Sequence, residues 1–303
     1  LILFVFFMNH MKILISGASG FIGKNLTKFL FEKNHQIQLL TRNPNLSENK
    51  NIQFWEPDNF KLNKSLVEKS DIVISLNGKN IISPFRNKLR EIKSSRYNAI
   101  ETFISTFGAC TKLPKLFISA SACGFYGDRP NEILDEYSPK GNGILSDISN
   151  EWENKSSLKN LRVVNLRFGN IIHNDSYMFN QLKKFCKIIG TNKINGGDFF
   201  FPWISLLDTL RAIEHIIYNE KITGPINITS NNNLRFNEVF NDLNQVIKPL
   251  IKIPIPKILI KSIFGQIGVE ALLNDQKVVP LKLQNTKFQW IVRTPLESLN
   301  SVL

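Results

Sequence analysis

Cysteine and histidine are scarce, and neither occurs in a pattern that would build a structural site. The 303-residue chain has three cysteines, Cys110, Cys123 and Cys186, and no Cys-x-x-Cys motif. An odd number without such a motif argues against a disulfide framework and against a cysteine zinc site. The four histidines show no metal-ligand spacing either. The sequence therefore predicts no metal centre and suits a reducing, cytoplasmic compartment.

Long apolar segments are also lacking. The apolar run at the start, Leu1–Phe7, is too short to cross a bilayer, and no basic segment precedes it. The chain opens with leucine, whereas a clean strand pattern begins at Met11. We expect residues 1–10 to be an over-extended leader of the reading frame, and we expect no stable membrane insertion.

Acidic residues are outnumbered by basic ones, 25 against 38, which gives a net charge of +13. This balance suits phosphate-bearing ligands, nucleic acid or an anionic membrane surface. The lysines are scattered, however, and no basic helix or RNA-binding aromatic motif accompanies them. The amino-acid bias of an A/T-rich coding sequence therefore explains the positive charge better, and we expect no nucleic-acid partner. Apolar residues make up 43% and charged residues 21%, as in ordinary globular proteins.

Strand-like and helix-like patterns alternate along most of the chain. Apolar strand runs occur at residues 11–16, 37–43, 71–78 and 114–122, with helix-like segments at 24–35 and 88–110. Repeated strand–helix–strand units predict a parallel sheet with helices on both faces. We therefore expect an α/β doubly wound parallel sheet with a smaller, mostly helical C-terminal domain on the substrate side.

Three glycines follow the first predicted strand. Gly17, Gly20 and Gly23 stand where that strand gives way to a helix, the setting in which this spacing indicates a Rossmann-type dinucleotide site. The first glycine permits the tight turn, the second lets backbone N–H groups approach a pyrophosphate, and the third lets the helix pack closely. The motif predicts cofactor contacts from Gly17, Ser19, Gly20, Phe21, Ile22 and Gly23.

The end of the second predicted strand bears on which dinucleotide binds. A carboxylate at this position usually bonds the ribose of NAD, but here Arg42 follows Leu40 and Thr41. An arginine suits the 2′-phosphate, so we predict NADP(H) in preference to NAD(H). The alternative is that Arg42 is a solvated surface residue.

Further segments along the chain, taken together with the glycine motif, resemble those of a known family. In order along the chain occur DIVISLNGKNI, SSRYNAIETF, LFISASACGFYGD, NEWE, LRFGNII, FFFPWISLLDTL, GPINITS and ALLNDQKVVPLKLQNTKFQW. From Met11 onward the chain resembles the extended short-chain dehydrogenase/reductase superfamily. More narrowly, it resembles the atypical NAD-dependent epimerase/dehydratase branch named "epimerase family protein", which has its own C-terminal domain.

The resemblance implies an NADP(H)-binding oxidoreductase-like or epimerase-like protein with a small-molecule substrate. It divides the chain into an NADP-binding Rossmann domain, residues 11–172 and 205–230, and a substrate-side domain, residues 173–204 and 231–303. It leaves monomer and homodimer open, and it adds the plastid stroma as a compartment if the source is eukaryotic. Some relatives are called cell-division inhibitors, so a cell-division role is a further alternative.

The sequence departs from the superfamily in its catalytic residues. Extended members use a Tyr-x-x-x-Lys pair, in which lysine lowers the pKa of the tyrosine. None of the five tyrosines here is followed four positions later by lysine, and Ile144 and Ile148 take the expected positions. Whether the chain is an enzyme is therefore open, with a non-catalytic nucleotide-binding regulator or scaffold as the alternative.

The predicted catalytic residues are Ser121 and Tyr126, although matching Tyr126 to the superfamily puts Ala122 rather than Ser121 at the serine position. For Ser121, satisfying backbone groups is an equal alternative, and for Tyr126 a packed aromatic ring is the stronger one. Ser119 is predicted to contact the cofactor at the nicotinamide side of the pocket, and satisfying backbone groups is its alternative as well.

The resemblance assigns the remaining positions. Leu76, Asn77 and Gly78 are expected to pass the cofactor, and Arg96 to brace the sheet or the cofactor, with helix packing as its alternative. The predicted substrate wall is Phe201 and Trp203, for which a core role is an equal alternative.

Overall fold

The computed structural model describes residues 10–82, 89–177, 179–181, 183–184, 196–248 and 255–301. The predicted leader, apart from His10, and Cys186 lie outside these residues. No helix of the described segments is long and apolar enough to cross a membrane. No group of three or more metal-ligating side chains occurs in the same segments.

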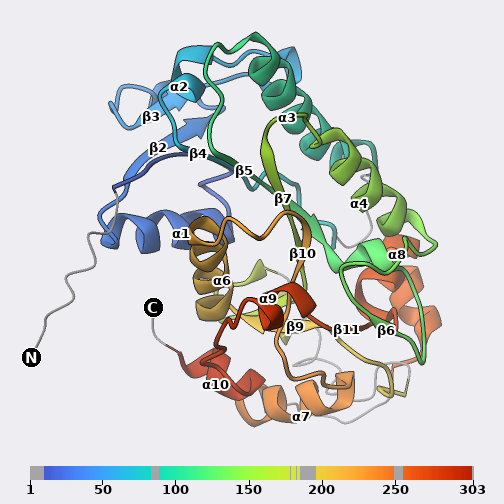
Figure 1. The fold of residues 1–303 in the computed structure, drawn as a ribbon. Coiled ribbons are helices and arrows are strands. Elements are labelled where there is room, and N and C mark those ends of the chain that lie inside the picture. Colours follow the sequence, from blue (N-terminus) through green and yellow to red (C-terminus); the bar gives the residue numbers. More distant parts are fainter. Residues whose placement is uncertain are drawn as a thin grey trace, which may run out of the picture.

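A seven-stranded sheet forms the centre of the molecule, and its neighbouring strands all run parallel (Figure 1). The strand order is β10-β7-β5-β4-β1-β2-β3. This order confirms the predicted doubly wound, Rossmann-type α/β fold, because the chain winds outward from β1 in both directions. The strands are β1 (Lys12–Ser16), β2 (Gln36–Thr41), β3 (Ile52–Phe54), β4 (Ile72–Ser75), β5 (Leu116–Ala122), β7 (Arg162–Phe168) and β10 (Gly224–Ile228).

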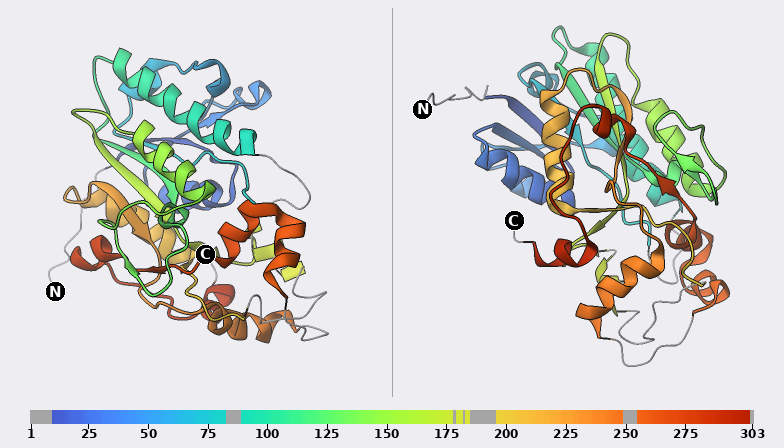
Figure 2. Two further views of the ribbon diagram at one scale, coloured as in Figure 1. Left: turned by 90° about the vertical axis from the view of Figure 1, so that its right-hand side faces the viewer. Right: turned by 60° about the horizontal axis from the view of Figure 1, so that its bottom comes forward.

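Helices cover both faces of the sheet. On one face α1 (Phe21–Glu32) packs against α6 (Leu206–Tyr218), and on the other α3 (Leu89–Ala109) packs against α2 (Lys64–Glu68) and α4 (Ile144–Lys155). Figure 2 shows α6 and α4 on opposite sides of the strands. Ile13 and Ile15 join the first core, and Leu14 between them joins the second. The strands read as continuous apolar runs because both of their faces are buried.

Smaller elements complete the fold. Two short parallel sheets pair β8 (Asn170–Ile172) with β9 (Trp203–Ser205), and β6 (Ile133–Leu134) with β11 (Lys277–Val278). The later helices are α7 (Phe236–Ile247), α8 (Lys257–Leu273), α9 (Leu281–Asn285) and α10 (Pro295–Asn300). Short 3₁₀ turns are η1 (Pro44–Leu46), η2 (Pro57–Asn59) and η3 (Cys123–Tyr126).

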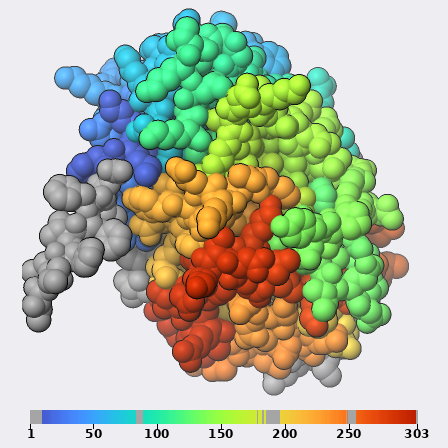
Figure 3. All heavy atoms as spheres, in the orientation of Figure 1, coloured from blue at the N-terminus to red at the C-terminus, as the bar shows by residue number. Residues whose placement is uncertain are grey.

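The C-terminal residues take part in two separate cores. An aromatic cluster beside the sheet gathers Phe199, Phe236 and Phe240 with residues of α8 and α10. Farther along, Leu283 and Phe288 return to the core under the sheet. In Figure 3 the red C-terminal residues lie directly against orange and green parts of the chain. The division of the chain into two domains stays a prediction.

Asp208 attaches the C-terminal segment to α6. The helix is capped by Ser205, whose Oγ accepts a hydrogen bond from the Asp208 N–H at 3.0 Å. The fully buried Asp208 carboxylate instead accepts hydrogen bonds from the N–H groups of Ile291 and Val292, both at 3.0 Å. A carboxylate that satisfies two backbone donors fixes the course of this segment over the helix.

Candidate functional site

The glycine turn between β1 and α1 is built too tightly for side chains. Gly17 has a φ of +77°, and a Cβ there would lie 2.6 Å from the backbone of Leu76. At Gly23 a Cβ would lie 2.3 Å from the carbonyl oxygen of Gly17. The Gly20 N–H closes the turn on the same oxygen at 3.0 Å. These contacts give Gly17 and Gly23 the two roles that the motif predicts for them, a turn and a close helix approach.

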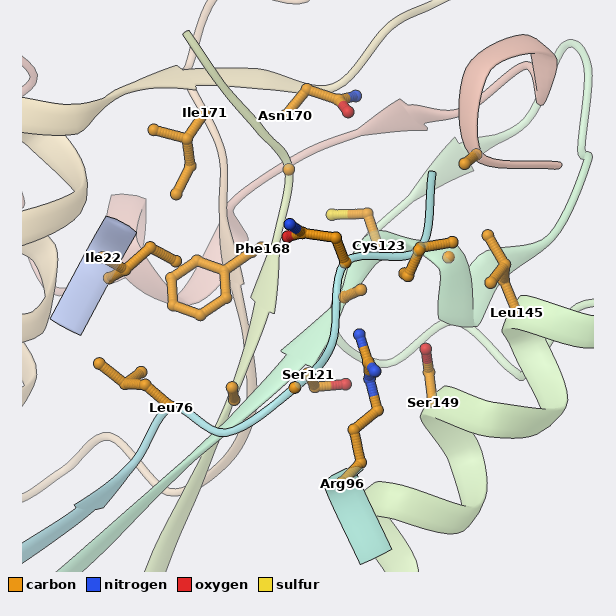
Figure 4. A pocket seen from close by; sticks show the side chains of 18 of the residues that line it. Ile22, Leu76, Arg96, Ser121, Cys123, Leu145, Ser149, Phe168, Asn170 and Ile171 are labelled. Carbon is orange, nitrogen blue, oxygen red and sulfur yellow. The ribbon is translucent and has the colours of Figure 1, made fainter. Parts of the chain in front are cut away.

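A pocket of about 370 Å³ opens from this turn along the carboxyl ends of the central strands (Figure 4). Its wall follows β1, β4, β5 and β7 in turn, and α4 and α8 close the other side. Ligands of doubly wound sheets bind in this crevice, where the strand order reverses. Of the predicted site residues, the pocket is lined by Gly17, Gly20, Phe21, Ile22, Gly23, Leu76, Asn77, Gly78 and Ser121.

Asn77 is fixed by serines of two strands. Its Oδ1 accepts hydrogen bonds from the hydroxyl of Ser16 on β1 and from that of Ser75 on β4, the latter at 3.3 Å. Both serines are fully buried. The strands thus hold rigid the backbone that passes the glycine turn, which a preformed nucleotide site requires.

Ser121 stands at the pocket and is held by a charged pair beneath it. Its hydroxyl donates to Glu153 Oε1 at 2.7 Å. Glu153 in turn receives two hydrogen bonds from the Arg167 guanidinium, Nε to Oε1 and Nη2 to Oε2, each at 2.8 Å. The pair is almost completely buried, with side chains 10% and 3% exposed. A bidentate pair in this setting is geometrically precise, so it orients the serine hydroxyl.

Tyr126 lies below the pocket and does not line it. Its ring is fully buried, and its hydroxyl accepts a hydrogen bond from Arg167 Nη1 at 2.9 Å. Asp135 O and Asn227 Oδ1 lie at 2.8 and 2.7 Å as acceptors. Burial raises the pKa of this phenol well above its usual value. This geometry does not supply the exposed phenol that a proton donor needs, and it matches the alternative of a buried aromatic ring.

Other predicted residues also fall outside the pocket wall. Ser119 is fully buried within β5, and its hydroxyl donates to the Ala120 carbonyl at 3.2 Å. Phe201 and Trp203 pack in the aromatic cluster, where the Trp203 indole donates to Asn232 O at 3.1 Å. Pro202, between them, faces the pocket instead. The structure thus gives both aromatics the core position that was the alternative.

Arg42 and Ser19 are exposed beside the predicted nucleotide site. Arg42 directly follows β2, whose neighbour in the sheet is β1. Because these two strands are parallel, the carboxyl end of β2 lies next to the glycine turn, the position that the prediction for a 2′-phosphate requires.

Ile144 and Ile148, which the resemblance puts at the tyrosine and lysine positions, both belong to α4. The helix starts at Ile144, and Ile148 lines the pocket one turn later. Near the helix start, Glu270 of α8 accepts a hydrogen bond from the Leu145 N–H at 2.8 Å. Glu270 thus satisfies one of the free N–H groups at the α4 N-terminus.

Several polar residues of the pocket region were not predicted as site residues. Glu153 occurs within the NEWE segment, but nothing in a linear sequence pairs it with Arg167 on β7 or with Ser121 on β5. Ser149 and Trp152 line the pocket from α4, where they follow the pocket residues Leu145 and Ile148 by four positions each and so lie on one face of the helix with them. The sequence could have indicated Ser149 and Trp152 through this shared face, because the resemblance puts Ile148 at the lysine position of the site.

Comparison with known proteins agrees with this geometry. The sequence model of the NAD dependent epimerase/dehydratase family matches residues 13–172. A chloroplastic epimerase family protein of Arabidopsis thaliana, a homolog of SDR39U1, is 26% identical over 97% of this chain and 87% of its own length. An epimerase family protein of Staphylococcus aureus is 28% identical over 91% of this chain and 94% of its own.

Solved structures show the same fold. The crystal structure of the human epimerase family protein SDR39U1 with NADPH has a TM-score of 0.84 and 24% identity, covering 96% of this chain and 100% of the human one. Since the family match spans more than half of the chain and includes the glycine turn and the strands that line the pocket, this protein belongs to the NAD dependent epimerase/dehydratase family.

Proposed function

We propose that the chain binds NADP(H) at the glycine turn and acts on a small-molecule substrate as an oxidoreductase-like or epimerase-like enzyme. The observation that carries the proposal is the turn itself, which excludes a Cβ at Gly17 and Gly23 and opens directly into the pocket that holds Ser121. A turn of this shape presents backbone N–H groups and a helix N-terminus to a diphosphate. The human relative solved with NADPH supports NADP(H) as the cofactor.

The residues present fit such a cofactor. Gly20, Phe21 and Ile22 line the pocket where α1 begins, and Leu76 and Gly78 line it across the sheet. Arg42 would take the 2′-phosphate, since an exposed guanidinium at the end of β2 has no carboxylate beside it in the neighbouring sequence. When bound, the nicotinamide supplies a hydride donor or acceptor.

The protein's own chemistry centres on Ser121. Because its hydroxyl proton is directed at Glu153, the oxygen lone pairs are available to a substrate hydroxyl. Glu153, held by Arg167, can take up the proton that Ser121 relays, which is general base catalysis through one intervening hydroxyl. Tyr126 then acts as a positioning residue, because it contacts Arg167 and not the pocket.

A non-catalytic regulator or scaffold, with cell division as one setting, is the second candidate. The absence of a Tyr-x-x-x-Lys motif from the sequence supports this candidate, because the resemblance puts apolar Ile144 and Ile148 at the positions of that pair. The proposed two-domain division and a cytoplasmic or plastid location are compatible with either candidate.

A titration with NADPH and NADH followed by a carbonyl and sugar-nucleotide substrate screen distinguishes the candidates. We expect saturable NADPH binding and, with one substrate class, NADPH consumption that Ser121→Ala reduces at least about tenfold. Binding without consumption in the screen would favour the regulator, and no binding of either nucleotide would contradict both.

A further inference from the structure

Arg96 is the starting point, because its charge faces the pocket from within the protein. The side chain comes from α3, is 7% exposed and lines the pocket. Figure 4 shows it pointing into the same space as Ser121 and Ser149. Its guanidinium lies 5.0 Å from the Trp152 ring, and the Cβ that Gly78 lacks would lie 3.2 Å from its Cζ.

The charge of Arg96 has no counter-ion among the side chains that the structure describes. All 25 acidic side chains belong to the described residues, and none of them forms an ion pair with Arg96. The contrast is Arg167, the other deeply buried arginine of the region, which pairs bidentately with Glu153. Burial lowers the pKa of Arg96 to about 10, so it stays protonated at neutral pH. A buried charge without a partner is costly unless a ligand supplies one.

Hydrogen bonds within the protein use only part of the guanidinium. Nη1 donates to Ile92 O at 3.0 Å, and Nη2 donates to Lys79 O at 3.1 Å. A guanidinium has five N–H groups, so donors are left over in the described surroundings. Both acceptors are backbone carbonyls, which fix the direction of the fork without neutralising its charge.

A second donor without a partner lies beside Arg96. The indole Nε1 of Trp152 is buried and has no hydrogen-bond partner among the described residues, and Trp152 lines the pocket. Buried N–H groups are normally paired, so an orphan in a pocket wall points to a ligand acceptor. Ser149, a residue 3% exposed, adds a hydroxyl to the same wall. An oxyanion with several lone pairs would satisfy these donors together.

The acidic groups nearest the pocket are already engaged. Glu270 accepts the Leu145 N–H at the start of α4. Glu153 is occupied by Arg167 and Ser121. The exposed Lys79 is neutralised by Glu91. Among the described side chains that line the pocket, Arg96 is therefore the positive charge without a salt bridge, and Glu270, held at the start of α4, keeps its negative charge.

We propose that the pocket selects a substrate with an anionic carboxylate or phosphate group, which Arg96 binds beside Trp152 and Ser149. The glycine turn supplies its own N–H donors for the cofactor diphosphate, whereas Arg96 comes from α3 and its guanidinium lies between Gly78 and the Trp152 ring of α4. Planar oxyanions match the arginine fork bidentately. The proposal rests on the proposed function, because it concerns the substrate part of the same pocket.

The test uses the full chain saturated with NADPH and four probes: benzoate, phenyl phosphate, inorganic phosphate and neutral benzamide. Calorimetric titration should show at least one anion binding, with benzamide at least about tenfold weaker. Arg96→Gln should weaken that anion at least about tenfold and leave benzamide unchanged. The matched control is Arg90→Gln, an exposed arginine on the same helix, which should bind like the native chain.

Several results would overturn the proposal. It fails if no anion binds, if benzamide binds as well as the anions, or if Arg96→Gln binds them like the native chain. It also fails if Arg96→Gln weakens NADPH itself tenfold, which would assign the charge to the cofactor. Should Arg96→Gln not fold, Arg96→Lys decides, since it keeps the charge but loses the fork and should bind the anion severalfold more weakly. NADPH binding by the native chain separately tests the proposed function.

Discussion

At the scale of single residues, the polar side chains in and beneath the pocket differ in whether the protein has already satisfied their hydrogen bonds. Tyr126, Arg167 and Glu153 have their partners within the fold, whereas Ser121 and Arg96 face the pocket with capacity to spare. The first group is expected to affect stability and geometry, with Glu153 also serving the proposed proton relay, and the second group is expected to affect ligands. One substitution in the first group, and one at the proposed nucleotide site, separate effects on stability from effects on ligands.

Tyr126→Phe is expected to lower stability without lowering nucleotide affinity. The change leaves the buried Arg167 Nη1 without its acceptor, which costs about 1–3 kcal/mol of unfolding free energy. Urea unfolding measures the loss, and NADPH titration the affinity. Tyr137→Phe, at a side chain 74% exposed, is the control and should change stability by less than about 0.5 kcal/mol. A native-like stability would show that the phenol hydrogen bonds contribute little.

Arg42→Ala is expected to act on NADPH and spare NADH. A hydrogen bond to a charged group contributes about 1.5–3 kcal/mol, so the Kd for NADPH should rise about tenfold or more. Lys50→Ala removes an exposed charge farther along the chain and serves as the control. Equal losses for the two nucleotides would exclude a contact between Arg42 and the 2′-phosphate.

At the scale of elements, much of the arrangement could be predicted from the sequence. The apolar runs predict the strands β1, β4 and β5, and their alternation with helix-like segments predicts a parallel sheet with helices on both faces. The glycine spacing located the β1–α1 turn. The sequence could not predict the contacts among Ser121, Glu153 and Arg167. These residues come from β5, α4 and β7, and they touch only because those elements pack together. Likewise, apolar Phe201 and Trp203 have the same pattern in a core as in a pocket wall.

Alanine substitutions at two glycines, one in the β1–α1 turn and one outside it, test whether the turn is too tightly packed for a side chain. At Gly23 a Cβ would overlap the backbone of the turn, so Gly23→Ala should cost about 1–3 kcal/mol of stability and abolish tight NADPH binding. At Gly108, near the end of α3, a Cβ would meet nothing within 4 Å. Gly108→Ala should therefore stabilise the helix by about 0.5–1 kcal/mol and leave binding intact. Thermal unfolding and titration of both variants give the comparison, and normal binding by Gly23→Ala would refute the close-packed turn.

At the scale of the whole molecule, partly buried histidines make stability depend on pH. Burial lowers the pKa values of His35, His173 and His215 below the ordinary value of 6.5. As pH falls through that value, the unfolded chain takes up protons that the folded chain does not, so the free energy of unfolding decreases. The window lies between the ordinary value and the lowered ones, and the slope is at most ~1.4 kcal/mol per pH unit for each histidine.

Urea unfolding at about pH 7.5 and about pH 5.5 measures this decrease. Glu136 acts in the opposite direction, because burial raises its pKa and the folded chain holds its proton more tightly. Replacing the three histidines by glutamine isolates their part and should flatten the dependence. A native chain that is equally stable at both pH values, and whose triple variant behaves identically, would contradict the account.

The central claim is that the glycine turn binds NADP(H), and calorimetric titration of the purified chain with NADPH and with NADH tests it most directly. The account predicts saturable one-to-one binding of NADPH, weaker binding of NADH, and loss of both in Gly23→Ala but not in Gly108→Ala. Absence of binding by the native chain, or binding that survives Gly23→Ala unchanged, would contradict it.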